Sequence, residues 1–108
     1  MSDLNLIYIT CESERQALTI GRELMGRRLV ACINVIPRVT SLSFWPPQTG
    51  KIEQASEVVL ICKTTAAKWK QIEAAVRKLH SYDNPFIAAI PLSQISKQYA
   101  DWLSGEIK

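Results

Sequence analysis

The sequence predicts one α+β domain over residues 1–108, in which helices pack on a single sheet. Strand-like and helical periods follow one another in the order strand, helix, strand, strand, helix, strand. The second and third strand-like runs, 29–45 and 51–64, are long and are separated only by Pro46-Pro47-Gln48-Thr49-Gly50. This order is typical of the ferredoxin-like βαββαβ sandwich, here with a long protruding hairpin and a short C-terminal helix.

The first strand is expected at 4–10, where nearly every residue is apolar. A helix should follow, because Ser13 and Gln16 have the spacing of a capping box. Its period places one set of side chains inward: Ala17, Ile20, Leu24 and Met25. Gly26 and the two arginines after it end the helix.

The hairpin that follows is too long for the domain to cover. Each arm of about fourteen residues spans about 45 Å at about 3.3 Å per residue, whereas a compact domain of this size is about 34 Å across. Pro37 gives a place for a bulge, since proline cannot donate to the ladder. The tip carries apolar residues, namely Leu42, Phe44, Trp45 and Ile52. An exposed apolar ribbon of this kind indicates an oligomerisation arm.

A second helix is expected at 66–79, with Trp69, Ile72, Val76 and Leu79 facing inward. A fourth strand should occupy 86–90, and a last helix 96–103. Right-handed crossovers place the first and third strands in the centre and both main helices on one face. The strands are apolar on both faces, so a neighbouring subunit is expected to cover the other.

Composition excludes several classes of protein. No apolar run approaches the length of a membrane span, and the N-terminus lacks the features of a signal peptide. Three cysteines are too few for a disulfide framework, which favours a reducing, cytoplasmic location. The net charge of +3 does not argue for a nucleic-acid partner. No Ser-His-Asp set, phosphate-binding glycine loop or carboxylate pair is evident, so an enzyme is not expected.

The cysteines are the first candidates for chemistry. The topology predicts that Cys11, Cys32 and Cys62 lie toward one end of the sheet. If Trp45 pairs with Lys51, Asn34 lies opposite Cys62, and Cys32 is two residues away on the same face. Thiolates in such a group favour copper(I) or zinc. The alternative is that they pack as small hydrophobic residues.

The second candidate site is a cleft around His80, the only histidine. His80 and Tyr82 lie in a loop after a helix, where the imidazole could bind a metal or an anion, or could act as a helix-terminal cation. Lys51 and Glu53, near the hairpin tip, could complete this cleft from another subunit, with Trp45 as an apolar wall. The alternative is that these residues serve interface packing and ion pairs.

The segment Leu29-Val30-Ala31-Cys32-Ile33-Asn34-Val35-Ile36-Pro37 resembles the CutA family of divalent-cation tolerance proteins. The resemblance continues through Gly50-Lys51-Ile52-Glu53, Lys63-Thr64, Leu79-His80, Tyr82 and Ile90-Pro91. It implies a homotrimer similar in architecture to PII signalling proteins, which binds copper or other divalent cations in metal tolerance.

The resemblance also implies site residues. Cys32 corresponds to the family's recurrent cysteine, and Lys51, Glu53, His80 and Tyr82 correspond to residues around an intersubunit cleft. The family's usual Tyr-Trp-Trp is Ser43-Phe44-Trp45 here, and its usual His-Pro-Tyr-Glu is His80-Ser81-Tyr82-Asp83. A PII-like sensor in which Lys51 and His80 hold a small anion is the alternative function.

Overall fold

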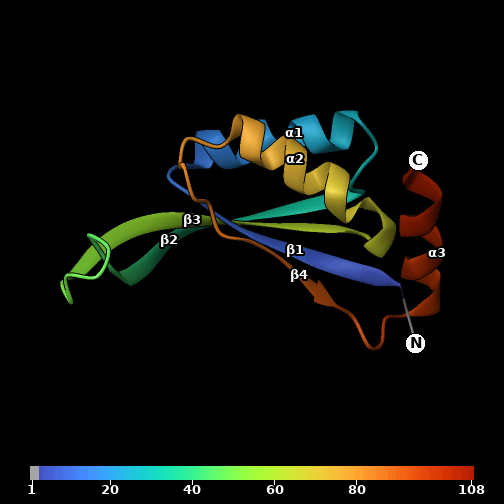
Figure 1. The fold of residues 1–108 in the computed structure, drawn as a ribbon. Helices are drawn as coiled ribbons and strands as arrows, with labels where there is room; N and C mark the ends of the chain where they lie inside the picture. Colours follow the sequence, from blue (N-terminus) through green and yellow to red (C-terminus); the bar gives the residue numbers. More distant parts are fainter. Residues whose placement is uncertain (1–2) are drawn as a thin grey trace.

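The chain folds in the predicted order of strands and helices (Figure 1). The structure, a computed structural model, describes residues 3–108. The elements are β1 (Leu4–Cys11), α1 (Glu14–Gly26), β2 (Cys32–Phe44), β3 (Ile52–Thr65), the short 3-10 helix η1 (Ala66–Lys68), α2 (Trp69–Leu79), β4 (Ile87–Pro91) and α3 (Lys97–Glu106). The last helix extends three residues beyond its predicted end.

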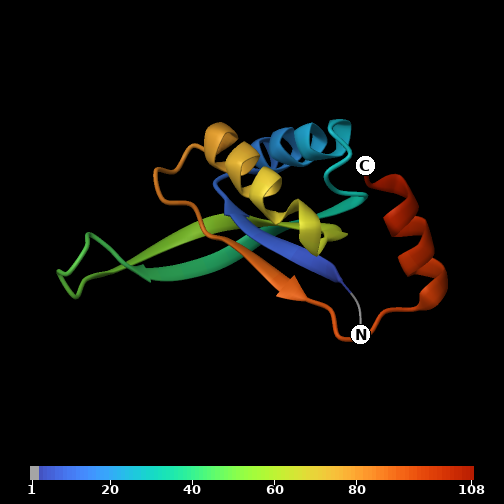
Figure 2. The same cartoon turned by 45° about the vertical axis from the view of Figure 1, so that its right-hand side comes forward.

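The four strands form one antiparallel sheet in the order β2-β3-β1-β4. The first and third strands are therefore central, as predicted for the ferredoxin-like fold. α1 and α2 lie side by side over one face of the sheet (Figures 1 and 2). Between them and the sheet lies the main core, where Ile7, Ile9 and Leu60 of the central strands meet Ile20 and Val76 of the helices.

Helix α1 begins as its sequence predicts, with one difference. The Ser13 hydroxyl accepts a hydrogen bond from the Gln16 amide at 3.1 Å, and the Gln16 side chain accepts one from the Glu12 amide at 3.0 Å. The reciprocal bond of the capping box thus reaches one residue further back than usual. Met25 and Leu79, predicted to face inward, are 40% and 37% exposed. Each lies at the edge of the buried face of its helix, next to a buried residue: Leu24 precedes Met25, and His80 follows Leu79.

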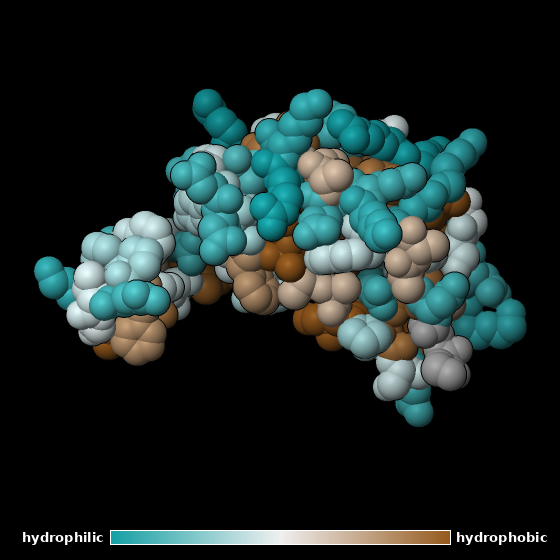
Figure 3. Space-filling model, in the orientation of Figure 1, coloured by the Kyte–Doolittle hydropathy of each residue, from teal (hydrophilic) through white to brown (hydrophobic). Residues whose placement is uncertain are grey.

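The hairpin of β2 and β3 projects from the body, which confirms its predicted protrusion (Figure 1). The molecule measures 47 Å along its longest axis and 26 and 24 Å across. At the hairpin end, Leu42 is 66% and Phe44 74% exposed. Space-filling atoms show apolar side chains on one side of the hairpin end and below the helical layer (Figure 3).

A bulge at Pro37 changes which residues face each other near the base of the hairpin. Trp45 donates its amide to the Lys51 carbonyl at 3.0 Å, so the pairing predicted at the turn is confirmed. The ladder is irregular between Ile36 and Val39. From Ile36 to the base of the hairpin, the pairing of β2 with β3 is shifted by one residue relative to the pairing at the tip. Ile33, not Asn34, therefore lies opposite Cys62. Cys32 was predicted on the same face of the sheet as Cys62. Because neighbouring strand residues point to opposite faces, the shift places Cys32 on the opposite face from Cys62.

The second face of the sheet is covered only at one end. There α3 packs through Leu103 on Leu4 and Ala31. Ile36 and Ile90 remain exposed elsewhere on the sheet. Among residues 3–108, no helix has the length and apolar character needed to cross a membrane.

The close approach of α1 to β2 generates a testable prediction. Gly21 is buried against Ile33, and a Cβ at position 21 would overlap the Ile33 Cδ1 atom. We expect Gly21→Ala to lower the free energy of unfolding by about 1 kcal/mol, because overpacking outweighs the gain in helix propensity. Urea denaturation measures this change.

The matched background is Ile33→Val, which removes the overlapping methyl group. In that background Gly21→Ala should raise the free energy of unfolding, since only the helix-propensity gain remains. Gly105→Ala in α3, where a Cβ meets nothing within 4 Å, serves as a second control. The same loss in both backgrounds would contradict this account of the α1–β2 contact.

Candidate functional site

His80 is a buried, hydrogen-bonded residue rather than an exposed ligand. Its side chain is 8% exposed at the end of α2. Nδ1 accepts a hydrogen bond from the Tyr82 amide at 3.1 Å, and Nε2 lies 2.7 Å from the Thr10 carbonyl. Because Nδ1 must offer a lone pair to an N–H group, the ring proton is on Nε2 and is donated to Thr10. The imidazole was expected to be able to bind a metal or an anion, but in the single chain both ring nitrogens are already used to connect the loop to β1.

Tyr82 and Glu57, both half-buried, lie beside His80 on the solvent side of this region. The Tyr82 hydroxyl donates a hydrogen bond to Glu57 Oε2 at 2.9 Å, and its ring lies 4.8 Å from that of His80. Burial of the phenol, and next the hydrogen bond to Glu57, raise the pKa of Tyr82 to about 12. The Gln16 side chain donates to Ser81 at 2.7 Å and ties the same loop to α1. The loop is thus held by β1, β3 and α1 together.

The structure does not bring the three cysteines together. Cys11 lies opposite Val58, whereas Cys32 lies opposite Lys63, five positions further along β3. Cys11 and Cys62 are buried in the core under the helices, and Cys32 is half-buried on the other face. The predicted shared end of the sheet holds for Cys32 and Cys62, which occupy neighbouring positions of the β2–β3 ladder, but is wrong for Cys11. Because β1 runs antiparallel to β3, the end of β1 that carries Cys11 lies beside Val58, whereas Cys62 lies opposite Ile7.

The chemistry of the buried thiols agrees with a packing role. Desolvation by burial raises the pKa of Cys11 to about 11 and that of Cys62 to about 12. A metal is bound by the thiolate, so such groups are poor ligands near neutral pH. Among the described residues 3–108, no three His, Cys, Asp or Glu side chains are grouped so that they could hold a metal.

The other half of the predicted cleft lies on the hairpin. Trp45, Lys51 and Glu53 are exposed near its tip. Glu53 is four residues from Glu57 along β3, roughly 13 Å, and Lys51 lies further out. One chain therefore does not join these side chains to the His80 loop. Glu57, which does reach that loop, was not among the predicted cleft residues; its only sequence signal is that it shares a strand face with Glu53.

The chain is similar to known proteins over almost its whole length. The family model described as CutA1 divalent ion tolerance protein matches residues 5–106. A divalent-cation tolerance protein CutA of Archaeoglobus fulgidus is 36% identical over 104 residues, which are 96% of this chain and 98% of that protein. One of Thermus thermophilus is 36% identical over 98 residues, covering 91% and 92%.

Solved structures agree with this similarity. The crystal structure of CutA from Xylella fastidiosa superposes with a TM-score of 0.92 at 34% identity and covers 99% of this chain and all of its own. The Archaeoglobus fulgidus structure, described as a periplasmic divalent cation tolerance protein, has a TM-score of 0.91 at 36% identity, with coverage of 97% and 99%.

The bonds of His80 predict a structural role that can be measured. His80→Ala should lower the free energy of unfolding by about 2–3 kcal/mol, because it leaves buried backbone groups without partners. Asp83→Asn, at an exposed position of the same loop, should change it by less than about 0.5 kcal/mol. A long-range ¹⁵N correlation spectrum of the wild type should show protonated Nε2 and unprotonated Nδ1. A proton on Nδ1, or an unchanged stability in His80→Ala, would contradict this role.

The Tyr82 hydroxyl predicts a dependence of stability on alkaline pH. Its pKa is raised above the ordinary value of 10.0, so its contribution to stability is complete below pH 10 and is lost as pH rises toward 12. Tyr82→Phe should therefore lose less stability than the wild type between pH 10 and 12. Cys11 and Cys62 titrate in the same range, and Cys11 also raises the pKa of Tyr82, so both proteins are compared in a Cys11→Ala background. Equal slopes in urea denaturation across that range would disprove the assignment.

Proposed function

The chain belongs to the CutA1 divalent ion tolerance family, and on that premise we propose that it is a homotrimer that binds copper or another divalent cation between its subunits. The family supports a role in metal-ion tolerance. The observation that carries the finer proposal is the separation, within one chain, of the hairpin tip with Lys51 and Glu53 from the His80 loop, which only Glu57 of the hairpin reaches. A site that needs both is completed only when a second subunit supplies one of them.

The trimer is supported by two apolar surfaces that one chain leaves open. The hairpin end exposes Leu42, Phe44, Trp45 and Ile52, each by more than half of its surface. The sheet face opposite α1 and α2 is covered by α3 at one end alone. Contiguous exposed apolar surface is typical of a protein–protein interface, and obligate interfaces are the more hydrophobic class. A hairpin laid on the uncovered sheet of a neighbour would remove both surfaces from water.

The cation site is proposed between subunits because the free donors are divided. Cys32 is half-buried on the uncovered face of the sheet. Glu53 lies on the hairpin, and the ion pairs found among residues 3–108 do not include it. Carboxylate oxygen suits many divalent ions, and a thiolate adds affinity for copper. His80 then positions Tyr82 and the loop through its hydrogen bonds, whereas Lys51 and Trp45 form the edge of the cleft.

The proposed activity is binding, not catalysis, and the proposed location is the cytoplasm. The relatives are named for cation tolerance and not for a reaction. The cytoplasmic location rests on the unpaired cysteines. A PII-like sensor that holds a small anion through Lys51 and His80 has less support, because both ring nitrogens of His80 already serve the fold.

A change at the hairpin end tests assembly and binding together. The double variant Leu42→Ser, Phe44→Ser should convert trimer to monomer, because it removes apolar side chains from the proposed interface. Both side chains are exposed in the single chain, so the fold of the monomer should lose little stability. Sedimentation equilibrium at micromolar concentration measures the mass. Equilibrium dialysis with copper(II) should show binding by the wild type that drops at least tenfold in this variant.

The control is Leu18→Ser on α1, an exposed leucine on the helical side, which should keep both mass and binding. Cys32→Ser and Glu53→Gln, tested in the trimer, separate the donors from the assembly and should each weaken binding. A monomeric wild type would disprove the trimer. Equal copper binding by a monomeric variant would disprove the site between subunits.

A further inference from the structure

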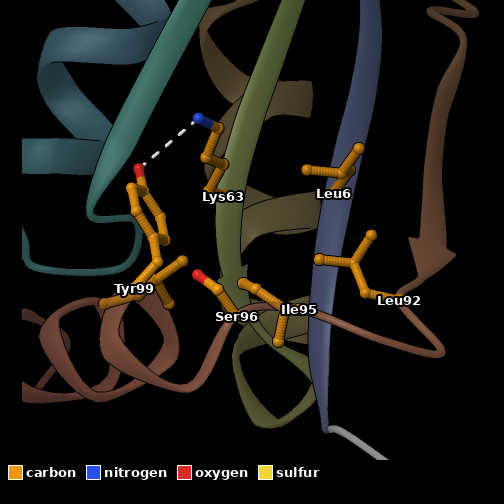
Figure 4. Close-up of a pocket in the computed structure, with 7 residues that line it drawn as sticks. Leu6, Lys63, Leu92, Ile95, Ser96 and Tyr99 are labelled. Carbon is orange, nitrogen blue, oxygen red and sulfur yellow. Dashed lines mark hydrogen bonds between the residues drawn. The ribbon is translucent and has the colours of Figure 1, made fainter.

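A cavity apart from the proposed cation site lies beneath α3, on the sheet face that α1 and α2 do not cover (Figure 1). Its volume is about 260 Å³ and it is open on one side. The walls are apolar: Leu6 of β1, Leu92 and Ile95 of the segment after β4, and Leu103 of α3. Lys63, Ser96 and Tyr99 add polar atoms (Figure 4). None of these residues belongs to the hairpin end or to the His80 loop.

Lys63 is the one charged group in the lining, and within the described part of the chain it has no carboxylate partner. The half-buried ammonium donates a hydrogen bond of 3.4 Å to the Tyr99 hydroxyl and lies 5.2 Å from the centre of that ring. The ion pairs found among residues 3–108 do not include Lys63. Withdrawing a cation from water is costly unless an opposite charge approaches it. The ring and hydroxyl of Tyr99 compensate only in part, so the cavity has an unmatched positive charge.

A further hydroxyl group lies on the same side of the cavity, at the opposite end of the Tyr99 side chain from the ammonium (Figure 4). The Ser96 side chain makes no capping hydrogen bond to α3. In the close-up, the Ser96 hydroxyl lies on the same side of the cavity as Tyr99, whereas Leu6, Leu92 and Ile95 surround the remaining space (Figure 4). One side of the cavity thus carries the Lys63–Tyr99 pair at one end and the Ser96 hydroxyl at the other, and the opposite side is apolar. An amphipathic molecule of matching length would satisfy both.

We propose that this cavity binds a small monocarboxylate with an apolar body. A cavity of about 150 Å³ holds a benzene-sized molecule, so this one has room for a ring or short chain together with a carboxylate. The single cation matches one negative charge, whereas a phosphate dianion would need more donors. A neutral hydrocarbon would leave Lys63 unmatched. The carboxylate contacts Lys63 and Tyr99, and the apolar body packs on Leu6, Leu92 and Leu103.

Benzoate is the probe that tests this proposal, with benzamide as its uncharged counterpart. The Trp102 ring lies 5.2 Å from that of Tyr99, so tryptophan emission should change on binding. Isothermal titration of the full chain at pH 7 should give a saturable site with a Kd of about 1 mM for benzoate, as expected for so small a ligand. Benzamide should bind at least tenfold more weakly.

Three variants identify the residues involved. Lys63→Met should weaken benzoate binding at least tenfold and abolish the preference for benzoate over benzamide. Leu92→Trp should fill the cavity and prevent binding of both probes. Lys97→Met is the matched control, because this lysine of α3 is exposed and paired with Asp101 at 2.7 Å; it should bind benzoate as the wild type does. Circular dichroism verifies that each variant is folded.

Several results would overturn the proposal. These are the absence of saturable benzoate binding, equal affinity for benzamide, or equal loss of binding in Lys97→Met and Lys63→Met. Sedimentation equilibrium tests whether a second copy of the chain occupies the cavity. If benzoate does not bind and Leu92→Trp alters the oligomeric mass, the cavity seats a second copy of the chain instead. The inference does not depend on copper binding, since the copper and benzoate experiments test variants at different residues.

Discussion

The packing of α1 and α2 on one face of the sheet determines which residues remain available for function. The central strands β1 and β3 direct alternate side chains toward these helices, and Ile7, Ile9 and Leu60 are completely buried there. Burying such a side chain stabilises a fold by about 1.5–3 kcal/mol, so a change of register that exposed the set would be prohibitive. The same alternation determines which side chains point to the opposite face of the sheet. Among the helices of the described chain, α3 packs on that face. Both the proposed interface and the cavity under α3 follow from that imbalance.

The bulge at Pro37 is the local feature with the widest effect on the candidate residues. It shifts the register of β2 against β3 by one position between the hairpin tip and the body. Cys32 therefore faces away from the core that encloses Cys62, and lies beside Lys63 instead. Arg38, with a φ of 59°, takes the left-handed conformation within this irregular stretch. Without the bulge, two thiols would share one face and a metal pair would be plausible.

His80 illustrates how a residue with catalytic and metal-binding chemistry can be committed to structure. Its two ring nitrogens join the Thr10 carbonyl at the end of β1 to the Tyr82 amide in the following loop. A buried polar group needs such partners, since leaving them unsatisfied costs about 1–3 kcal/mol. The same hydrogen bonds position Tyr82 against Glu57, so His80 shapes the exposed surface of the loop without lying on it. Its contribution to a binding site is therefore positional.

The sequence by itself determined the order of elements, the central place of β1 and β3, the capping of α1 at Ser13 and the protrusion of the hairpin. Each of these depends on a local period, a turn residue or the length of a segment. The sequence also resembled the CutA family through motifs that span the chain, and the comparisons agree with this. The exposed apolar hairpin end was predictable for the same reason, because its length exceeds the size of the body.

Only the tertiary structure decided the orientation and partners of the candidate residues. The face of Cys32 depends on a one-residue bulge, and the burial of His80 depends on Thr10, seventy positions away in the chain. The contact of Lys63 with Tyr99 likewise joins residues 36 positions apart. No local pattern encodes such contacts. They arise because the sheet and helices, once packed, bring distant backbone and side-chain groups within hydrogen-bonding distance, where each buried polar atom must find a partner.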